Sequence, residues 1–315
     1  MSDIKKRQHY VWRYYLRAWA KDERIWTYFK ELNKVQQPSL MQVGQEKYFY
    51  KLIDLADNEE QFLKKFIEHT SPASVRELNL TFFDMFTSAY KLKKSLEQSS
   101  LNDTDKDKLA KDIHLLENNL MEDAHCKIEA LGRDLLNCKN IDELKTLADN
   151  EDEGLLDAIM FLSFQYFRTS VRKKAVIEGF KNDPVHFQEL AKKTWNIVSY
   201  CMSTKLARSI SIDPKTRFVF IDNQTDTGFI TCDQPIFNML ADVVDENGDV
   251  TELELYYPLS PKTALIIHFR DDQTERFINE IIDIEKVEYL NGKVLEHADF
   301  FVFADNKEQL DKLVK

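Results

Sequence analysis

Two stretches decide the fold: RFVFIDNQTDTGFITCDQPIF, residues 217–237, and YYPLSPKTALIIHF, residues 256–269. In the first, polar and apolar residues alternate, a turn-forming segment rich in Asp, Asn, Thr and Gly follows, and an apolar run then resumes at Phe229. This pattern predicts two strands joined by a turn. The second stretch begins with a turn that two prolines stiffen and continues as an apolar strand, so we expect it to pair with the first.

The rest of the chain predicts strands at both ends and helices in the middle. The N-terminal part favours a helix at 10–19 and a strand at 24–29, with 47–50 as the strand's partner. The other expected strands are 217–221, 228–232, 253–257, 263–269 and 299–303. Apolar residues at helical spacing predict helices at 58–69, 78–96, 105–135, 140–150, 154–176, 184–202, 271–284 and 306–313.

These elements predict an α+β fold. A helical middle region would pack against a mixed, mainly antiparallel sheet built from the N-terminal hairpin and the C-terminal third. We divide the chain into an N-terminal helix and hairpin (1–56), a helical region (57–212) and an α+β region (213–315), expected to form one compact unit. With 7 glycines and 7 prolines among 315 residues, the sequence favours long helices over a turn-rich all-β fold.

Composition and charge exclude several classes of protein. There is no apolar run long enough for a membrane span and no secretory signal, so we expect a cytoplasmic protein without a membrane partner. The four cysteines show no Cys-x-x-Cys spacing, which indicates thiols in a reducing compartment. The net charge is −11, and about 22 acidic against about 10 basic residues follow position 212. This acidity argues against indiscriminate nucleic-acid binding, although the basic N-terminus could contact phosphate locally.

Two candidate site residues stand at opposite ends of the chain. Asp233 follows a buried strand just before Pro235, a place where sites are often built, although Asp also caps turns through its own backbone. His9 lies among aromatic and basic residues, where positive neighbours lower its pKa and keep it neutral, which suits a base or a ligand. The alternative for His9 is an ordinary half-buried histidine.

A third candidate set lies in the stretch FLSFQYFRTSVRKK, residues 161–174. Gln165, Arg168 and Arg172 share one stripe of a helix that is otherwise apolar nearly all round. A buried arginine requires an acid or an anion. Its partner could be Asp233, another internal carboxylate, or a substrate phosphate or carboxylate.

The spacing Glu122-x-x-His125 places a carboxylate and an imidazole on one helical face, as in carboxylate-bridged di-metal bundles. Those bundles need a second Glu-x-x-His motif, and the sequence offers none. A solvated helix face is therefore the expected role of this pair.

The order of several short motifs resembles a bacterial family of unknown function. The motifs are QHYVWRYYLRAWA (8–20), EKYFY (46–50), an acidic pair at 117 and 122, Q-x-x-R-T (165–169), FITCDQPI (229–236), YPLSP (257–261) and N-G with A-x-F-F-V-F-A (291–304). The family's signatures are an N-terminal QHYVPxxYLRxF and a C-terminal TSDNPV…PLSP. Trp12 replaces the family's first proline, and Cys232 and Gln234 replace serine and asparagine around Asp233.

The resemblance implies a cytosolic bacterial protein in a phage-defence setting, such as an effector with nuclease or other phosphodiesterase or hydrolase activity. In an enzyme, we expect Asp233 to bind a divalent metal or act as a base, His9 to be its acid–base partner and Arg168 to hold an anionic phosphate. Gln165, Arg172 and Asn291 would contact a nucleic-acid or nucleotide substrate. The alternative is a non-catalytic regulatory or interaction component, in which the acidic C-terminal face docks a protein partner. An anion or nucleotide sensor would use the same arginines without a base.

Overall fold

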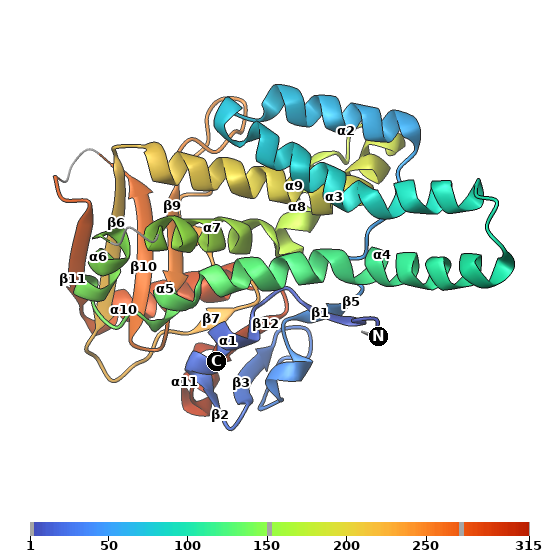
Figure 1. The fold of residues 1–315 in the computed structure, drawn as a ribbon. Coiled ribbons are helices and arrows are strands. Elements are labelled where there is room, and N and C mark those ends of the chain that lie inside the picture. The colour runs from blue at the N-terminus through green and yellow to red at the C-terminus, as the bar shows by residue number, and fades with distance from the viewer. Residues whose placement is uncertain (1–2, 150–152, 271–273, 315) are drawn as a thin grey trace.

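The computed structural model describes residues 3–149, 153–270 and 274–314 and has the predicted α+β fold, with a helical middle region beside two five-stranded sheets and a two-stranded ladder (Figure 1). The middle helices are α2 (Asp57–Thr70), α3 (Ala73–Glu97), α4 (Asp103–Leu131), α5 (Arg133–Asn137), α6 (Ile141–Asp149), α7 (Gly154–Phe167), α8 (Ser170–Gly179) and α9 (Val185–Ile212). Within the described ranges, no helix is long and apolar enough to cross a membrane.

The larger sheet comes from the C-terminal third, in the order β11-β6-β10-β9-β8. Its strands are β6 (Thr216–Asn223), β8 (Phe237–Asn238), β9 (Glu254–Pro258), β10 (Thr263–Phe269) and β11 (Phe277–Ile282). The predicted pairing of the two deciding stretches is confirmed, because Leu265 of β10 lies opposite Phe220 of β6 and Tyr257 of β9. Both pairings are antiparallel, whereas β11 joins β6 in parallel.

Both faces of the inner strands β6, β10 and β9 are buried. Phe220 and Leu265 join the main core with the helices, whereas the alternate residues Ile221 and Ile266 join a second cluster against α10 (Ile284–His297). Successive side chains of a strand point to opposite faces. Cover on both faces therefore accounts for the nearly continuous apolar runs in these strands.

A second sheet joins the two ends of the chain. Its order is β2-β3-β12-β7, with β4 on β3, and a separate ladder pairs β1 with β5. The strands are β1 (Arg7–His9), β2 (Ala20–Lys21), β3 (Arg24–Phe29), β4 (Lys34–Gln36), β5 (Gln45–Lys47), β7 (Thr231–Cys232) and β12 (Phe301–Ala304). The expected partner of β3 at 47–50 is wrong, because Tyr48 has a φ of +57° and ends the extended segment. The first deciding stretch also divides, since β6 and β7 enter different sheets.

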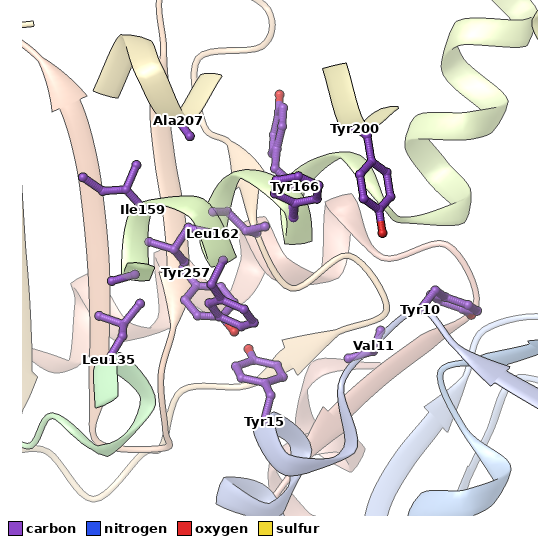
Figure 2. Close-up of a cluster of buried hydrophobic side chains, with 14 of the residues drawn as sticks. Tyr10, Val11, Tyr15, Leu135, Ile159, Leu162, Tyr166, Tyr200, Ala207 and Tyr257 are labelled. Atoms are coloured by element: carbon purple, nitrogen blue, oxygen red, sulfur yellow. The ribbon is translucent and has the colours of Figure 1, made fainter. Parts of the chain in front are cut away.

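The main core forms around α7, because eight of the fourteen residues of this helix are buried. Figure 2 shows Tyr15 and Tyr257 beside one another in this core; their rings stack with centroids 5.0 Å apart. Tyr15 Oη donates to the carbonyl of Pro258 at 2.9 Å, so a buried phenol is satisfied. The expected helix at 10–19 is the short α1 (Arg13–Leu16) followed by the 3-10 turn η1 (Arg17–Trp19); a second 3-10 turn, η2, spans Leu40–Gln42.

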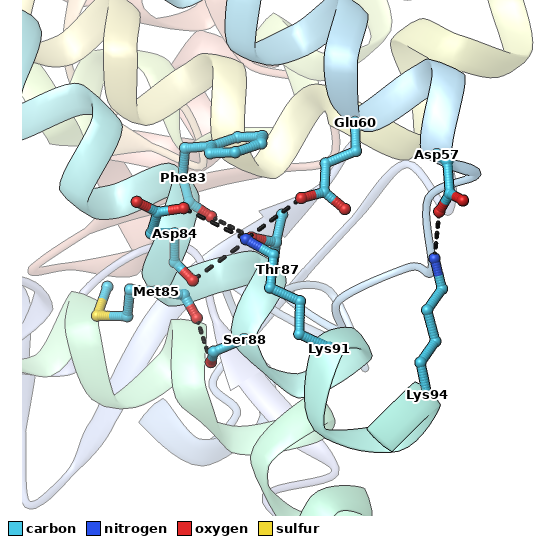
Figure 3. A network of polar contacts seen from close by, with 9 residues as sticks. All are labelled: Asp57, Glu60, Phe83, Asp84, Met85, Thr87, Ser88, Lys91 and Lys94. Carbon is cyan, nitrogen blue, oxygen red and sulfur yellow. Dashed lines mark hydrogen bonds and ion pairs between the residues drawn. The ribbon is translucent and has the colours of Figure 1, made fainter. Parts of the chain in front are cut away.

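Helices α2 and α3 also meet through a network of charged side chains (Figure 3). Lys94 Nζ lies 2.5 Å from Asp57 Oδ1, and Lys91 Nζ lies 3.2 Å from Glu60 Oε1. Solvent screens such exposed pairs, so they contribute little to stability. The buried apolar side chains of α2, Leu63 and Ile67, hold the helix in place instead.

Part of the C-terminal prediction is wrong. The helix expected at 271–284 is replaced by β11 and α10, and residues 271–273 of that prediction lie outside the described residues. Asp283 begins α10 because its carboxylate accepts a hydrogen bond from the Lys286 N–H at 2.9 Å, which is an N-cap. The Asn291-Gly292 pair of the family motif lies inside α10. The closing helix is present as α11 (Lys307–Leu313).

Candidate functional site

The N-terminal strand β1 is fixed against α4 by a buried glutamine. Gln8 Nε2 donates to the carbonyl of Asn118 at 2.7 Å, and its Oε1 accepts from the Tyr50 N–H at 2.6 Å. Gln8 is fully buried, so an unmade bond at either atom would carry a desolvation cost. These two bonds set the position of the next residue, His9, relative to α4.

Arg168 lies beneath His9 at the C-cap of α7, where it is 3% exposed. Its Nη2 lies 2.8 Å from Glu129 Oε1 and donates to the carbonyl of His9 at 2.5 Å, while Nε donates to Tyr50 Oη at 3.0 Å. The acid that the sequence requires for this arginine is therefore Glu129, an internal carboxylate other than Asp233. Burial raises the pKa of Glu129, and Arg168 opposes that shift.

A cavity of about 340 Å³ opens between this N-terminal segment and the α4–α5 face. It is lined by His9, Trp12, Arg13, Tyr14, Arg17, Glu122, Cys126, Glu129 and Arg133. Aromatic, cationic and titratable side chains therefore meet at one hollow of the surface.

Two groups of the cavity have strongly shifted pKa values. Burial raises the pKa of Glu122 to about 7, an effect that Arg168 partly offsets. Burial, and then the charge of Arg13, lower the pKa of His9 to about 4, so the predicted lowering is confirmed with burial as its main cause. Glu122 Oε2 and His9 Nε2 are both buried and have no hydrogen-bond partner within the described part of the chain.

The arginines at the cavity come from two places. Arg13 and Arg17 follow the turn after β1, and Glu23 pairs with both, at 3.4 Å to Arg13 Nη2 and 2.7 Å to Arg17 Nε. Arg133 is the first residue of α5 and is exposed. An anion entering the cavity would therefore meet guanidinium groups from both walls.

Three other predicted residues are engaged elsewhere. Gln165 Nε2 donates to the carbonyl of Tyr10 at 3.2 Å, and the Arg172 guanidinium lies 4.0 Å from the ring centroid of Tyr166. Asn291 Oδ1 accepts a hydrogen bond from the Ile230 N–H at 3.0 Å, and its Nδ2 donates to the carbonyl of Gly228 at 2.9 Å. Each of these side chains binds the protein's own groups and lies outside the lining of the cavity.

Asp233 directly follows β7 and is fully buried beside the segment that enters β12. Its carboxylate accepts three backbone N–H groups, from Asp299 at 2.9 Å, Phe300 at 2.7 Å and Phe301 at 3.3 Å. Burial raises its pKa to about 6 against these bonds. Arg168 thus contacts the His9 backbone, but only His9 of these three lines the cavity, and Asp233 binds main chain elsewhere.

Two carboxylates of the cavity, Glu122 and Glu129, are not among the site residues predicted from the sequence. Glu122, Cys126 and Glu129 recur at spacings of four and three, which places them on one face of α4, and Arg133 follows four residues later as the first residue of α5. All four line the cavity. This polar stripe is the signal that the sequence carries. His125 of the motif Glu122-x-x-His125 does not lie on a solvated helix face, because it is buried between the rings of Tyr50 and Tyr200.

A metal centre is not evident in the part of the chain that the structure describes. No three His, Cys, Asp or Glu side chains there gather closely enough to hold a metal ion.

A model of the family described as "Protein of unknown function (DUF4238)" matches residues 7–308. Comparison with curated proteins and with solved structures returned no match. The match covers nearly all of the described chain, from β1 into α11, and confirms the predicted resemblance to a family of unknown function.

Proposed function

Since the chain belongs to the DUF4238 family of unknown function, we propose its activity from the cavity itself: hydrolysis of a phosphate ester, as by a nuclease or another phosphodiesterase. One observation carries the proposal. A carboxyl group with a pKa of about 7, Glu122, faces the same cavity as three arginines. A general acid–base catalyst works best when its pKa lies near the working pH, and guanidinium groups suit phosphate oxygens.

The residues take distinct roles in this reaction. Water adds to phosphorus, the P–O bond to the leaving group breaks, and protonated Glu122 gives its proton to the departing oxygen. His9, with a pKa of about 4, is too weak a base to take a proton fully from water at neutral pH. His9 therefore lines the cavity without a proton-transfer role in this scheme. The proton lost by water passes to solvent, and the Glu122 carboxylate takes up a proton from solvent again.

Arg168 is a positioning residue in this scheme. It touches the His9 carbonyl and pairs with Glu129, and thereby fixes the backbone that carries the imidazole. Arg13, Arg17 and Arg133 would hold the phosphate. A nuclease with this site would also fit the phage-defence role that the sequence resemblance implies.

The test is hydrolysis by the purified chain of bis(4-nitrophenyl) phosphate, DNA and RNA, with and without Mg²⁺ or Mn²⁺. We expect turnover by the wild type and a loss of about 10²- to 10⁴-fold in Glu122→Gln. Glu97→Gln, an exposed change on α3, is the matched control, and thermal melting monitors folding. Equal rates in wild type and a folded Glu122→Gln would contradict the proposal. No turnover on any of these substrates would favour the non-catalytic interaction component.

A further inference from the structure

The proposed active-site cavity has an aromatic wall that the hydrolysis scheme does not use. Trp12, the N-cap of α1, and Tyr14 line it with ring centroids 4.9 Å apart and a 34° tilt. Both side chains are partly exposed. Rings at a pocket surface offer a π-face to a flat ligand.

These rings are held in place from behind. The Trp12 ring meets Phe161 of α7 edge-on at 5.7 Å, and Tyr14 Oη donates to Asn137 Oδ1 at 2.9 Å. Fixed rings lose little conformational entropy when a ligand stacks on them. The wall is therefore a prepared surface and not a pair of free side chains.

Cations alternate with the rings along the same segment. In WRYYLR, residues 12–17, Arg13 lies between Trp12 and Tyr14 and Arg17 follows the aromatics, and Arg133 of α5 lines the same cavity. Aromatic stacking combined with arginine contacts is the chemistry that binds single nucleotides and unpaired strands. Neither feature alone would select a nucleotide; the cavity holds both within about 340 Å³.

We propose that the cavity binds a nucleoside phosphate unit, with the base against Trp12 and the phosphate at the arginines. This inference rests on the proposed function and names its substrate class. The cavity volume lies near the lower limit for small-molecule sites, which suits one nucleotide unit. A base inside a duplex is stacked on both faces and must be flipped out to reach such a wall. The unit is therefore a free nucleotide or an unpaired nucleotide of a single strand.

Isothermal titration calorimetry tests this with five probes: inorganic phosphate, ribose 5-phosphate, adenosine 5′-monophosphate, a 5′-phosphorylated single-stranded octanucleotide and its duplex. We expect the wild type to bind adenosine monophosphate about 5- to 150-fold more tightly than ribose 5-phosphate. Trp12→Leu should remove that difference and leave ribose 5-phosphate binding unchanged. Trp12→Phe, which keeps a ring, should retain most of it, and Tyr289→Leu on the exposed face of α10 is the matched control.

The outcomes separate the two proposals. Equal affinity for adenosine monophosphate and ribose 5-phosphate, or a difference that survives in Trp12→Leu, would overturn the stacking role and leave a phosphate site intact. A duplex that binds as tightly as the single strand would also overturn it. Tighter binding of the octanucleotide than of adenosine monophosphate supports a strand end as the source of the unit, and the reverse supports a free nucleotide. If no probe binds and no ester is hydrolysed, both proposals fail.

Discussion

About two helical turns of α4 separate Glu122 from Glu129, and the two carboxylates have different partners. Arg168 Nη2 lies 2.8 Å from Glu129 Oε1, whereas Glu122 Oε2 is buried without a hydrogen-bond partner in the described part of the chain. One helix face therefore carries a carboxylate neutralised by an ion pair and another that can exchange a proton. Such a division between two acids is typical of catalytic sites, where the environment separates their pKa values.

The pKa of Glu122 predicts a measurable pH dependence of stability. In the folded state the pKa is raised to about 7 from 4.5, so the folded state holds this proton over a range in which the unfolded chain has lost it. This contribution is fully present below pH 4.5 and is lost as pH rises through about 7, with a size of no more than about 3 kcal/mol. Glu122→Gln should remove this contribution. The Tm of the variant minus the Tm of the wild type should therefore increase as pH rises from about 5 to 7.5.

The Tm difference between wild type and variant is the quantity to measure, because other groups act in the same range. The lowered pKa of His9, about 4, makes stability rise with pH between about 4 and 6.5, which opposes the Glu122 effect in the wild-type curve. Asp233, with a pKa of about 6, acts in the same direction as Glu122. Both are common to wild type and Glu122→Gln and cancel in the difference. A flat difference curve would mean that Glu122 is ionised as in water.

Replacing Arg168 should cause a large loss of stability, and a second substitution should restore part of it. Arg168→Met leaves Glu129 buried without its cation, and breaking a buried pair in this way costs about 3–5 kcal/mol. Adding Glu129→Leu removes the orphaned charge and should restore much of that loss. Urea unfolding measures both, with Arg7→Met on the exposed side of β1 as a control expected to lie within about 0.5 kcal/mol of wild type. A double variant as unstable as Arg168→Met would show that the bonds to His9 and Tyr50 matter more than the ion pair.

Sequence alone predicted the α+β class, the pairing of the two deciding stretches and the helical middle region, because these follow from apolar periodicity. It also predicted that Arg168 needs an acid or an anion as its partner. It could not identify Glu129 as that acid, because the choice depends on how α7 packs against α4, which leaves no local signal in the chain. The strand β11 was missed for a similar reason: Phe277–Ile282 pairs in parallel with β6, far away in sequence. Long-range packing also gave Asp233 three backbone donors from the segment entering β12, which no pattern around Asp233 could indicate.

A substitution of Asp233 distinguishes a catalytic role of this residue from a structural role. Asp233→Asn keeps the shape but turns an amide N–H₂ toward a backbone N–H, so we expect a loss of about 1–3 kcal/mol in unfolding free energy. If the residue only ties the chain to β12, turnover per folded molecule should stay near wild type. Loss of activity with an unchanged Tm would restore the catalytic role that the sequence predicts. Asp107→Asn on the exposed part of α4 is the control for the substitution itself.

Alanine in place of two different glycines should have opposite effects on the free energy of unfolding. A Cβ at Gly132, between α4 and α5, would lie 2.4 Å from Cγ of Phe161, whereas a Cβ at Gly292 in α10 would meet nothing within 4 Å. Gly132→Ala should therefore destabilise the protein by about 1–3 kcal/mol through overpacking. Gly292→Ala should stabilise it by up to about 1 kcal/mol, since alanine favours a helix over glycine. Combining Gly132→Ala with Phe161→Leu should recover part of the loss if the ring is the obstacle. Urea unfolding decides the matter, and two substitutions of equal sign would contradict the close contact at Gly132, which sets where Arg133 enters the cavity.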